Sequence, residues 1–389
     1  MTNGLSGPRK QFLDVLRVLA TCAVVLMHVL TGATDVTDAS IVPEYRSLLL
    51  SVMDLVTWRV PIFLLISGYL FLNPERTLTY PVMIKKYCRR IALAILLFGV
   101  PYAASELVVA ERTFRIRMIP EALKMTLMGH TWSHMWYLYL ILFLYLITPL
   151  LKKVLRVLPV WGVAAVMAVI FLGSSVAPFL NKVLDVNSIP VLPDGGVYFL
   201  YYLCGYFFAV REVCVDKGRN VWLTAAVAVL ALGMILSRTL AGFSIQMAYN
   251  YPFTVLLAVL LFAAGWEWRT ETARLWLPGR RTEHTGSLAG GGALSFAVYL
   301  VHPVYVNLLY KFVKITPFTV LEQCGVQSVA AGQAVLILLL VAICLVVLAL
   351  ATATAWSAAQ DPGVKKICAI EERSLTRRLL LRLLVMRII

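Results

Sequence analysis

The stretch "RVLATCAVVLMH", residues 17–28, places an arginine and a histidine at the two ends of ten uncharged residues. Its apolar composition is typical of a helix that crosses a bilayer. The spacing makes three helical turns and about 20° more, so Arg17 and His28 lie on one face, about 16 Å apart along the axis. Asp14 shares this face and can pair with Arg17. Because ionisable groups are costly in lipid, we expect this face to point into a bundle interior or a wet cavity.

The membrane character extends over the whole chain. Of its 389 residues, 60% are hydrophobic and 14% are charged, whereas soluble domains have about 45–50% and about 25%. A helix satisfies its own backbone hydrogen bonds in lipid, and the alternating pattern of a barrel strand is missing from the sequence. The sequence therefore predicts an all-α, polytopic transmembrane helix bundle. About ten spans are expected, roughly at residues 12–32, 47–72, 91–109, 135–151, 159–177, 196–210, 221–237, 249–266, 293–313 and 329–357.

The distribution of lysine and arginine predicts how the bundle is oriented. If the N-terminus is cytoplasmic, most of the 35 Lys and Arg residues fall in inner segments, as the positive-inside rule requires. Both termini are then cytoplasmic. One outer segment, 106–134, is an exception, and we interpret it as an interfacial amphipathic piece that carries Arg112, Arg115, Arg117 and Lys124.

Charge and cysteine content limit the partners that we expect. The net charge of +15 reflects topology, and no nucleic-acid motif accompanies it, so no nucleic-acid partner is expected. Residues 1–362 are predicted to form one membrane domain, and residues 363–389 a basic amphipathic cytoplasmic tail that lies on the anionic inner leaflet. In the predicted topology Cys324 is the one cysteine of seven on the outer side, so no disulfide within the chain is expected there. The sequence has no CxxC pair and its five histidines are scattered, so no metal site is expected.

A second span contains two further ionisable residues. In "DLVTWRVPIFLLISGYLF", residues 54–71, Asp54 and Arg59 are both within the predicted membrane region, and Pro61 interrupts the helix. Asp54 and His28 would both lie in the outer half of the bundle, where a carboxylate can orient an imidazole as a general base. Two alternatives stay open: Asp54 can pair with Arg59 as buried packing, and His28 can be a core histidine with satisfied hydrogen bonds. Later in the same stretch, Gly68 is expected to allow close helix packing.

For the other candidate residues, a purely structural role explains the sequence as well as a functional site does. His134, Trp136 and Tyr137 open the fourth predicted span. They have the composition of a sugar site and also that of an interfacial aromatic belt. His302 is followed by Pro303 in the ninth predicted span. Because proline frees a backbone carbonyl in a membrane helix, His302 can serve as a local hydrogen-bond partner instead of a site residue.

Five motifs, taken in order, resemble one known family. The piece "FLDVLRVLATCAVVLMH" is similar to the first helix of the bacterial membrane acyltransferase family three, whose hallmark is an arginine, ten residues and a histidine. The match covers nearly the whole chain and is most similar to the surface-polysaccharide O-acetyltransferase branch. The other four pieces are "VPIFLLISGYLF", "HMWYLYLILFLYLITPLL", "YFLYYLCGYFF" and "SFAVYLVHPVYV".

The resemblance implies transfer of an acyl group, usually acetyl, from cytoplasmic acyl-coenzyme A to a hydroxyl of a surface glycan or lipid-linked saccharide. Acetyl-coenzyme A would be a co-substrate and no cofactor would be permanently bound. The chain would lie in the bacterial cytoplasmic membrane, with the lipid bilayer as a further partner.

Residue roles follow from this reaction. His28 is the candidate general base, since imidazole titrates near neutral pH. Arg17 would bind a phosphate of coenzyme A or stabilise the oxyanion. A basic cluster would attract the polyanionic donor, unless it is only a topology signal: Lys85, Lys86, Arg89 and Arg90. Substrate binding is assigned to Asp14, Asp54, Arg59, His134, Trp136, Tyr137 and His302.

Two other classes of protein stay open at this point. In a transporter, Asp14, Arg17, Asp54 and Arg59 would line the translocation path. Transporters usually show internal repeats with broken helices in matching places, and the sequence has none that we detect. A non-catalytic membrane subunit that presents a lipid-linked glycan to a partner is the second alternative.

Overall fold

The protein is helical throughout the part that the structure describes. The computed structural model describes residues 8–36, 42–210, 219–239, 247–275, 286–326 and 328–360. Within these ranges the chain forms helices and turns and contains no strand, which confirms the all-α fold. The predicted tail at residues 363–389 lies outside the described residues.

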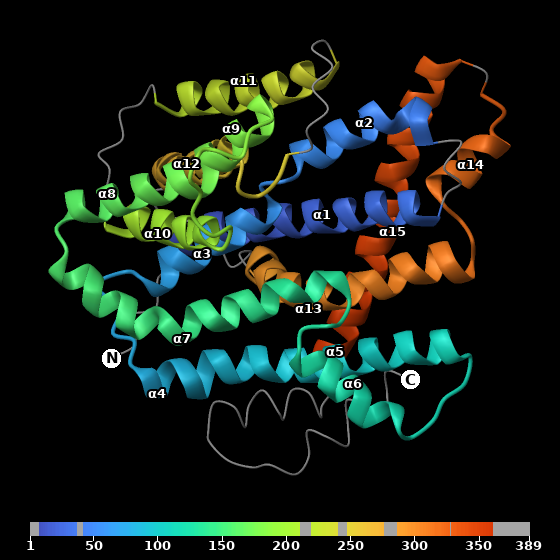
Figure 1. Cartoon of the computed structure of the whole chain (residues 1–389), viewed down its shortest axis with the longest axis horizontal. Helices are drawn as coiled ribbons and strands as arrows, with labels where there is room; N and C mark the ends of the chain where they lie inside the picture. The colour runs from blue at the N-terminus through green and yellow to red at the C-terminus, as the bar shows by residue number, and fades with distance from the viewer. Residues whose placement is uncertain are drawn as a thin grey trace. The chain divides into compact units, whose positions relative to one another are not determined.

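The described chain divides into two compact units, and Figure 1 labels most of their helices. Of the described residues, the first unit contains those within 8–70 and 164–356, and the second contains those within 71–163 and 357–360. The helices of the first unit are α1 Pro8–Val36, α2 Val42–Leu55, α3 Arg59–Phe71, α8 Val160–Phe171, η3 Leu172–Val176, α9 Ala177–Leu184, α10 Gly196–Val210, α11 Arg219–Thr239, α12 Pro252–Leu275, α13 Gly286–Asn307, η5 Leu308–Phe312, α14 Pro317–Gln323 and α15 Val329–Gln360.

The second unit is smaller and is built around two long helices. Its elements are α4 Tyr80–Val82, η1 Met83–Cys88, α5 Arg89–Glu111, α6 Met118–Leu127, η2 Ser133–Met135 and α7 Trp136–Val157. The α5 helix packs against α6 and α7, and α7 also packs against η1. The α6 helix lies within the predicted amphipathic segment 106–134, and it buries one face at Met118, Ala122 and Thr126.

Six helical segments among the described residues are long and apolar enough to cross a membrane. They are 12–35, 45–71, 80–111, 133–157, 160–184 and 329–358. The α13–η5 helix and α14, which meet at a bend of 41°, count as one more span if they are taken together. The apolar parts of α10, α11 and α12 are shorter. The polytopic bundle is thus confirmed, whereas the total of ten spans and the orientation stay predictions.

Helices α3 and α10 approach each other through two glycines. A Cβ atom on Gly68 would overlap the backbone carbonyl of Tyr202, and one on Gly205 would overlap the backbone at Leu65 and Tyr69. Backbone atoms cannot move aside as a flexible side chain can, so both positions require the absence of a side chain. This confirms the close packing that the sequence predicts at Gly68.

We predict that Gly68→Ala and Gly205→Ala each lower the free energy of unfolding by about 1–3 kcal/mol, because the added methyl group overpacks the contact between the two helices. Gly233→Ala on α11 is the matched control, since a Cβ there meets nothing within 4 Å. The control should leave stability unchanged or raise it by up to about 1 kcal/mol. Thermal unfolding of the purified protein measures all three, and equal unfolding temperatures would contradict the close approach.

Candidate active site

The α1 and α13 helices form the most extensive helix pair of the first unit. Near the end of α1, a Cβ on Gly32 would lie 3.1 Å from both Tyr310 Cδ2 and Val306 Cγ1. The Tyr310 hydroxyl donates a hydrogen bond of 3.0 Å to the Val29 carbonyl. A tight steric fit and a buried hydrogen bond therefore fix how far α1 can move along α13–η5.

This packing brings His28 against His302. The two imidazole rings have centroids 5.1 Å apart and planes inclined at 51°. His302 is fully buried, whereas His28 keeps part of its surface exposed. The sequence treated the two histidines as separate candidates on spans far apart in the chain, and the structure makes them neighbours.

The hydrogen bond of His302 fixes its tautomer. His302 Nδ1 lies 3.1 Å from the carbonyl oxygen of Val298, one turn earlier on α13. A carbonyl only accepts hydrogen bonds, so Nδ1 carries the hydrogen and Nε2 carries the lone pair in the neutral ring. The Tyr299 ring lies 6.2 Å from the His302 ring and forms part of its wall.

Arg59 is buried and lies near His28. Its guanidinium donates a hydrogen bond of 3.0 Å to the Val56 carbonyl at the break between α2 and α3, and it stacks 5.1 Å from the centre of the Tyr249 ring. The charge of Arg59 lies close enough to act on the His28 imidazole. A permanent positive charge is therefore held near the candidate base by a carbonyl and an aromatic ring.

Asp54 anchors the segment that leads into α12. Only 1% of Asp54 is exposed, and its Oδ1 accepts a hydrogen bond of 2.9 Å from the Met247 amide. Its neighbour Thr57 lies 3.3 Å from Thr254, hydroxyl to hydroxyl. Asp54 and Arg59 are thus both directed to residues 247–249, so the segment before α12 is tied to the break before α3.

Tyr249 links Arg59 to the aromatic face of α10. The Tyr201 hydroxyl donates a hydrogen bond of 2.6 Å to the Tyr249 carbonyl, and the Tyr198 ring lies 6.3 Å from the Tyr249 ring. Tyr249 therefore joins Arg59 to α10, and no sequence motif had indicated it.

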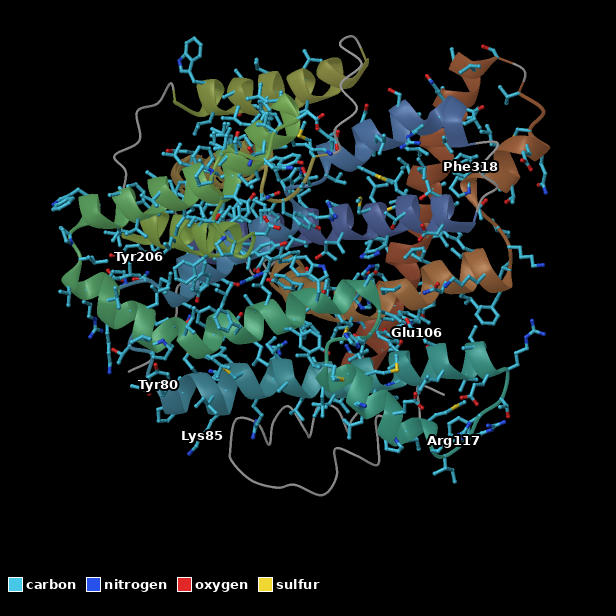
Figure 2. All side chains as sticks on the ribbon, in the orientation of Figure 1. Tyr80, Lys85, Glu106, Arg117, Tyr206 and Phe318 are labelled. Carbon is cyan, nitrogen blue, oxygen red and sulfur yellow. The ribbon has the colours of Figure 1, made fainter. Side chains whose placement is uncertain are left out.

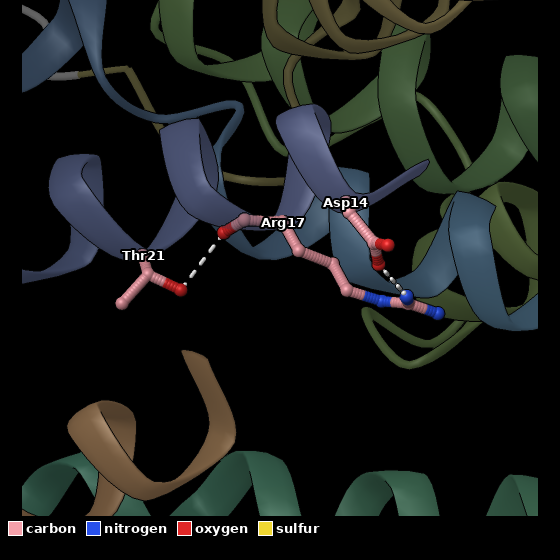
Figure 3. A network of polar contacts seen from close by, with 3 residues as sticks. All are labelled: Asp14, Arg17 and Thr21. Atoms are coloured by element: carbon pink, nitrogen blue, oxygen red, sulfur yellow. Dashed lines mark hydrogen bonds and ion pairs between the residues drawn. The ribbon is translucent and has the colours of Figure 1, made fainter. Parts of the chain in front are cut away.

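Arg17 and Asp14 form the pair that the sequence predicts (Figure 3). The Arg17 guanidinium lies 2.7 Å from Asp14 Oδ1, and the two side chains are 28% and 14% exposed. Thr21 Oγ1 donates a hydrogen bond of 2.8 Å to the Arg17 carbonyl. The pair keeps enough exposed surface to meet a ligand, and Asp14 already satisfies part of the charge of Arg17.

The second unit positions His134 in an aromatic cluster. His134 is 4% exposed, and its ring lies edge-on to Tyr102 at 5.6 Å. Trp132 stacks flat on Tyr102, with centroids 4.1 Å apart and planes 1° apart. Trp136 and Tyr137 contact each other edge-on at 6.3 Å. The sequence missed Trp132, although it precedes His134 by two residues, and it missed Tyr102, which no local signal marks.

The four predicted donor-binding cations are accessible. Lys85 and Lys86 lie on η1, and Arg89 and Arg90 open α5; all four are exposed. The Lys85 side chain extends outward from the helix (Figure 2). Among the described residues, no group of three or more His, Cys, Asp or Glu side chains could hold a metal ion.

Residues 10–356 match the family model of acyltransferase family 3, which describes an acyltransferase domain. The chain belongs to acyltransferase family 3. It is therefore an enzyme that transfers acyl groups, and its apolar helices make it a multi-pass membrane acyltransferase. The match includes the helices that carry Arg17, His28 and His302, and it favours an enzyme over a transporter or a non-catalytic subunit. No curated protein and no solved structure matches the chain.

We predict that Asp54→Asn retains folding and activity, because the amide oxygen of asparagine can still accept the Met247 amide. Asp54→Ala leaves that buried N–H without its acceptor and should lower stability by about 1–3 kcal/mol. Thermal unfolding and acyl-transfer rates of the two variants test this assignment. A folded Asp54→Asn protein without activity would show instead that the carboxylate charge takes part in the chemistry.

Proposed function

We propose that this acyltransferase moves an acyl group, acetyl in the simplest case, from acyl-coenzyme A to a hydroxyl of a cell-surface polysaccharide or lipid-linked saccharide. It would act in the bacterial cytoplasmic membrane, with acyl-coenzyme A as a co-substrate and no permanently bound cofactor. The observation that carries the proposal is the pairing of His28 with His302 at 5.1 Å. His28 lies on α1, the helix with the arginine–histidine spacing, and both histidines lie within residues 10–356, which match the family model.

The chemistry needs a base because an alcohol is a poor nucleophile at neutral pH. His28 accepts the hydroxyl proton while the alcohol oxygen attacks the thioester carbonyl carbon. The new carbon–oxygen bond gives a tetrahedral oxyanion, whose collapse breaks the carbon–sulfur bond. His28 then returns the proton to the leaving sulfur. The products are an ester and the free thiol of coenzyme A, and His28 is neutral again.

His302 acts as a positioning residue for this base. With its hydrogen on Nδ1 toward Val298, its Nε2 lone pair can accept from a ring N–H of His28. The two rings lie 5.1 Å apart, centre to centre, and we propose that they turn toward each other to form this bond when the substrates are bound. Such a bond would leave the lone pair of His28 on the opposite nitrogen, which is the one that meets the acceptor hydroxyl.

The two arginines would divide the stabilisation of negative charge. Arg59 is buried and acts on the His28 imidazole, so we assign it to the oxyanion, which develops beside the base. Arg17 lies about three helical turns before His28 and keeps more exposed surface. We assign Arg17, with Asp14, to a phosphate of the donor.

The aromatic cluster around His134 is our candidate for acceptor recognition. Stacked aromatic rings offer flat apolar surfaces for a sugar ring, and a histidine can hydrogen-bond a hydroxyl. The flat pair of Tyr102 and Trp132 with the edge-on His134 favours this role over an interfacial belt, in which side chains meet lipid headgroups.

We predict that His28→Ala lowers the rate of acyl transfer by about 10²–10⁴-fold while the protein still inserts and folds, because the general base is lost. The measurement is acceptor-dependent release of the coenzyme A thiol by the purified enzyme. The unfolding temperature, compared with that of the wild type, serves as the folding control. A folded and fully active His28→Ala protein would rule out His28 as the base.

We predict that His302→Ala lowers kcat and moves the acidic limb of the pH profile of kcat/KM, since the His28 imidazole loses its hydrogen-bond partner. His302→Gln, whose amide can still reach toward His28, should recover part of both effects. If His302 only fills space, the two variants will change stability without shifting the pH profile.

We predict that transfer requires the donor and the acceptor on opposite faces of the membrane. Coenzyme A is polyanionic and stays on the side where basic residues gather. A pantetheine arm that extends from Arg17 would cover the roughly 16 Å to His28. Vesicles of known orientation, with acetyl-coenzyme A on one side and acceptor glycan on the other, test this arrangement. Transfer only when both substrates are on the same side would contradict it.

A further inference from the structure

Lys152 on α7 is a buried lysine in the second unit. It is only 5% exposed, and its ammonium donates a hydrogen bond to the backbone carbonyl of Asn73. The nearby charges that act on it are those of Arg76 and Arg156, both positive. Among the described side chains, no carboxylate forms an ion pair with Lys152. A buried ammonium that meets a neutral acceptor and like charges is unfavourable unless an anion joins it.

Aromatic rings hold the neighbouring arginine in place. The Phe71 ring packs at 4.8 Å from Tyr87 and at 4.6 Å from Tyr145. Arg76 stacks 5.2 Å from the Phe71 ring and 5.6 Å from the Tyr87 ring, and it hydrogen-bonds the Tyr87 hydroxyl at 2.5 Å. The guanidinium is thus fixed before any ligand arrives, which lowers the entropy cost of binding.

The local charge is positive in both segments that meet here. Residues 73–90 contain one acidic residue, Glu75, and five basic residues, whereas residues 152–156 contain three basic residues and no acidic one. Glu75 is exposed, and its amide donates to the Asn73 side chain in the turn. The α7 helix packs against η1, which carries the exposed Lys85 and Lys86.

The positive-inside rule does not explain this arrangement. That rule accounts for basic residues at the membrane surface, and the exposed Lys153 satisfies it. It gives no reason to bury the adjacent lysine beside two arginines. A ligand with two or more negative charges would turn the repulsion among the three cations into attraction.

We propose that Lys152, Arg76 and Arg156 form a binding site for a phosphate group. Lysine offers a compact charge and arginine a planar pair of donors, and both suit phosphate oxygens. The phosphate would come from acyl-coenzyme A, which rests on the function proposed above, or from the headgroup of an anionic lipid. The exposed cations of η1 and α5 extend the site toward a ligand with several phosphates, which favours the donor.

The test uses the purified full-length protein and two neutral variants. Lys152→Met keeps the apolar stem and removes the charge, and Lys153→Met is the matched control on the adjacent, exposed position. Coenzyme A is titrated calorimetrically into protein in nanodiscs of zwitterionic lipid. In parallel nanodiscs with phosphatidylglycerol, native mass spectrometry measures the anionic lipid retained by the protein. Unfolding temperatures confirm that each variant is folded, and Arg156→Gln replaces Lys152→Met if the latter does not fold.

We expect Lys152→Met to weaken coenzyme A binding about tenfold or more, Arg156→Gln to weaken it less, and Lys153→Met to change it less than twofold. If coenzyme A binding is unchanged but Lys152→Met loses the retained lipid, the phosphate belongs to a lipid. If the wild type does not bind coenzyme A yet retains lipid through Lys152, the site stands and the proposed donor is wrong. Unchanged binding of both ligands by a folded Lys152→Met protein overturns the proposal.

Discussion

The site depends on how closely α1 packs against α13. Gly32 leaves room for Tyr310 and Val306, and the Tyr310 hydroxyl closes the contact with a hydrogen bond to Val29. His28 lies one turn before Gly32 on the same helix, so this contact also sets the distance between the two imidazoles. A larger residue at position 32 would separate the helices and with them the histidine pair. The candidate chemistry therefore rests on a packing constraint located beside it.

A second constraint is the cost of charge in a membrane protein. Four ionisable residues that the sequence placed in spans have a defined partner: Asp14 pairs with Arg17, Asp54 with the Met247 amide, and Arg59 with Tyr249 and the Val56 carbonyl. The groups that hold Arg59 here are neutral, and for this reason we propose Arg59 as the cation that stabilises the oxyanion. The Val56 carbonyl at the break between α2 and α3 accepts hydrogen bonds from both the backbone amide and the guanidinium of Arg59.

Local sequence signals predicted the helices and the paired charges well. Hydropathy located the helices, and the spacing of Asp14 and Arg17 gave their contact, because both follow from the geometry of one helix. The sequence placed an interruption at Pro61, whereas α3 already includes Pro61 and the chain turns at residues 56–58. Proline within the first helical turn costs little because the first amides have no partner inside the helix.

The contacts between distant segments were not predictable in this way. His28 and His302, Arg59 and Tyr249, and Tyr102 and Trp132 each join separate helices or a helix and a loop. Periodicity predicts on which face of its own helix a residue lies. It does not predict which face of another helix that residue packs against. The buried Lys152 illustrates the same limit, because in the sequence it is indistinguishable from the exposed Lys153.

The most direct test of the account is an experimental structure of the enzyme in a bilayer mimic with a non-reactive acyl-coenzyme A analogue. We predict that the carbonyl carbon of the analogue lies beside His28, with room for an acceptor oxygen about 3–3.5 Å from that carbon. We also predict that His302 contacts the far side of the His28 ring. An analogue whose acyl group ends away from His28, or a His28 ring that does not contact His302, would contradict the account.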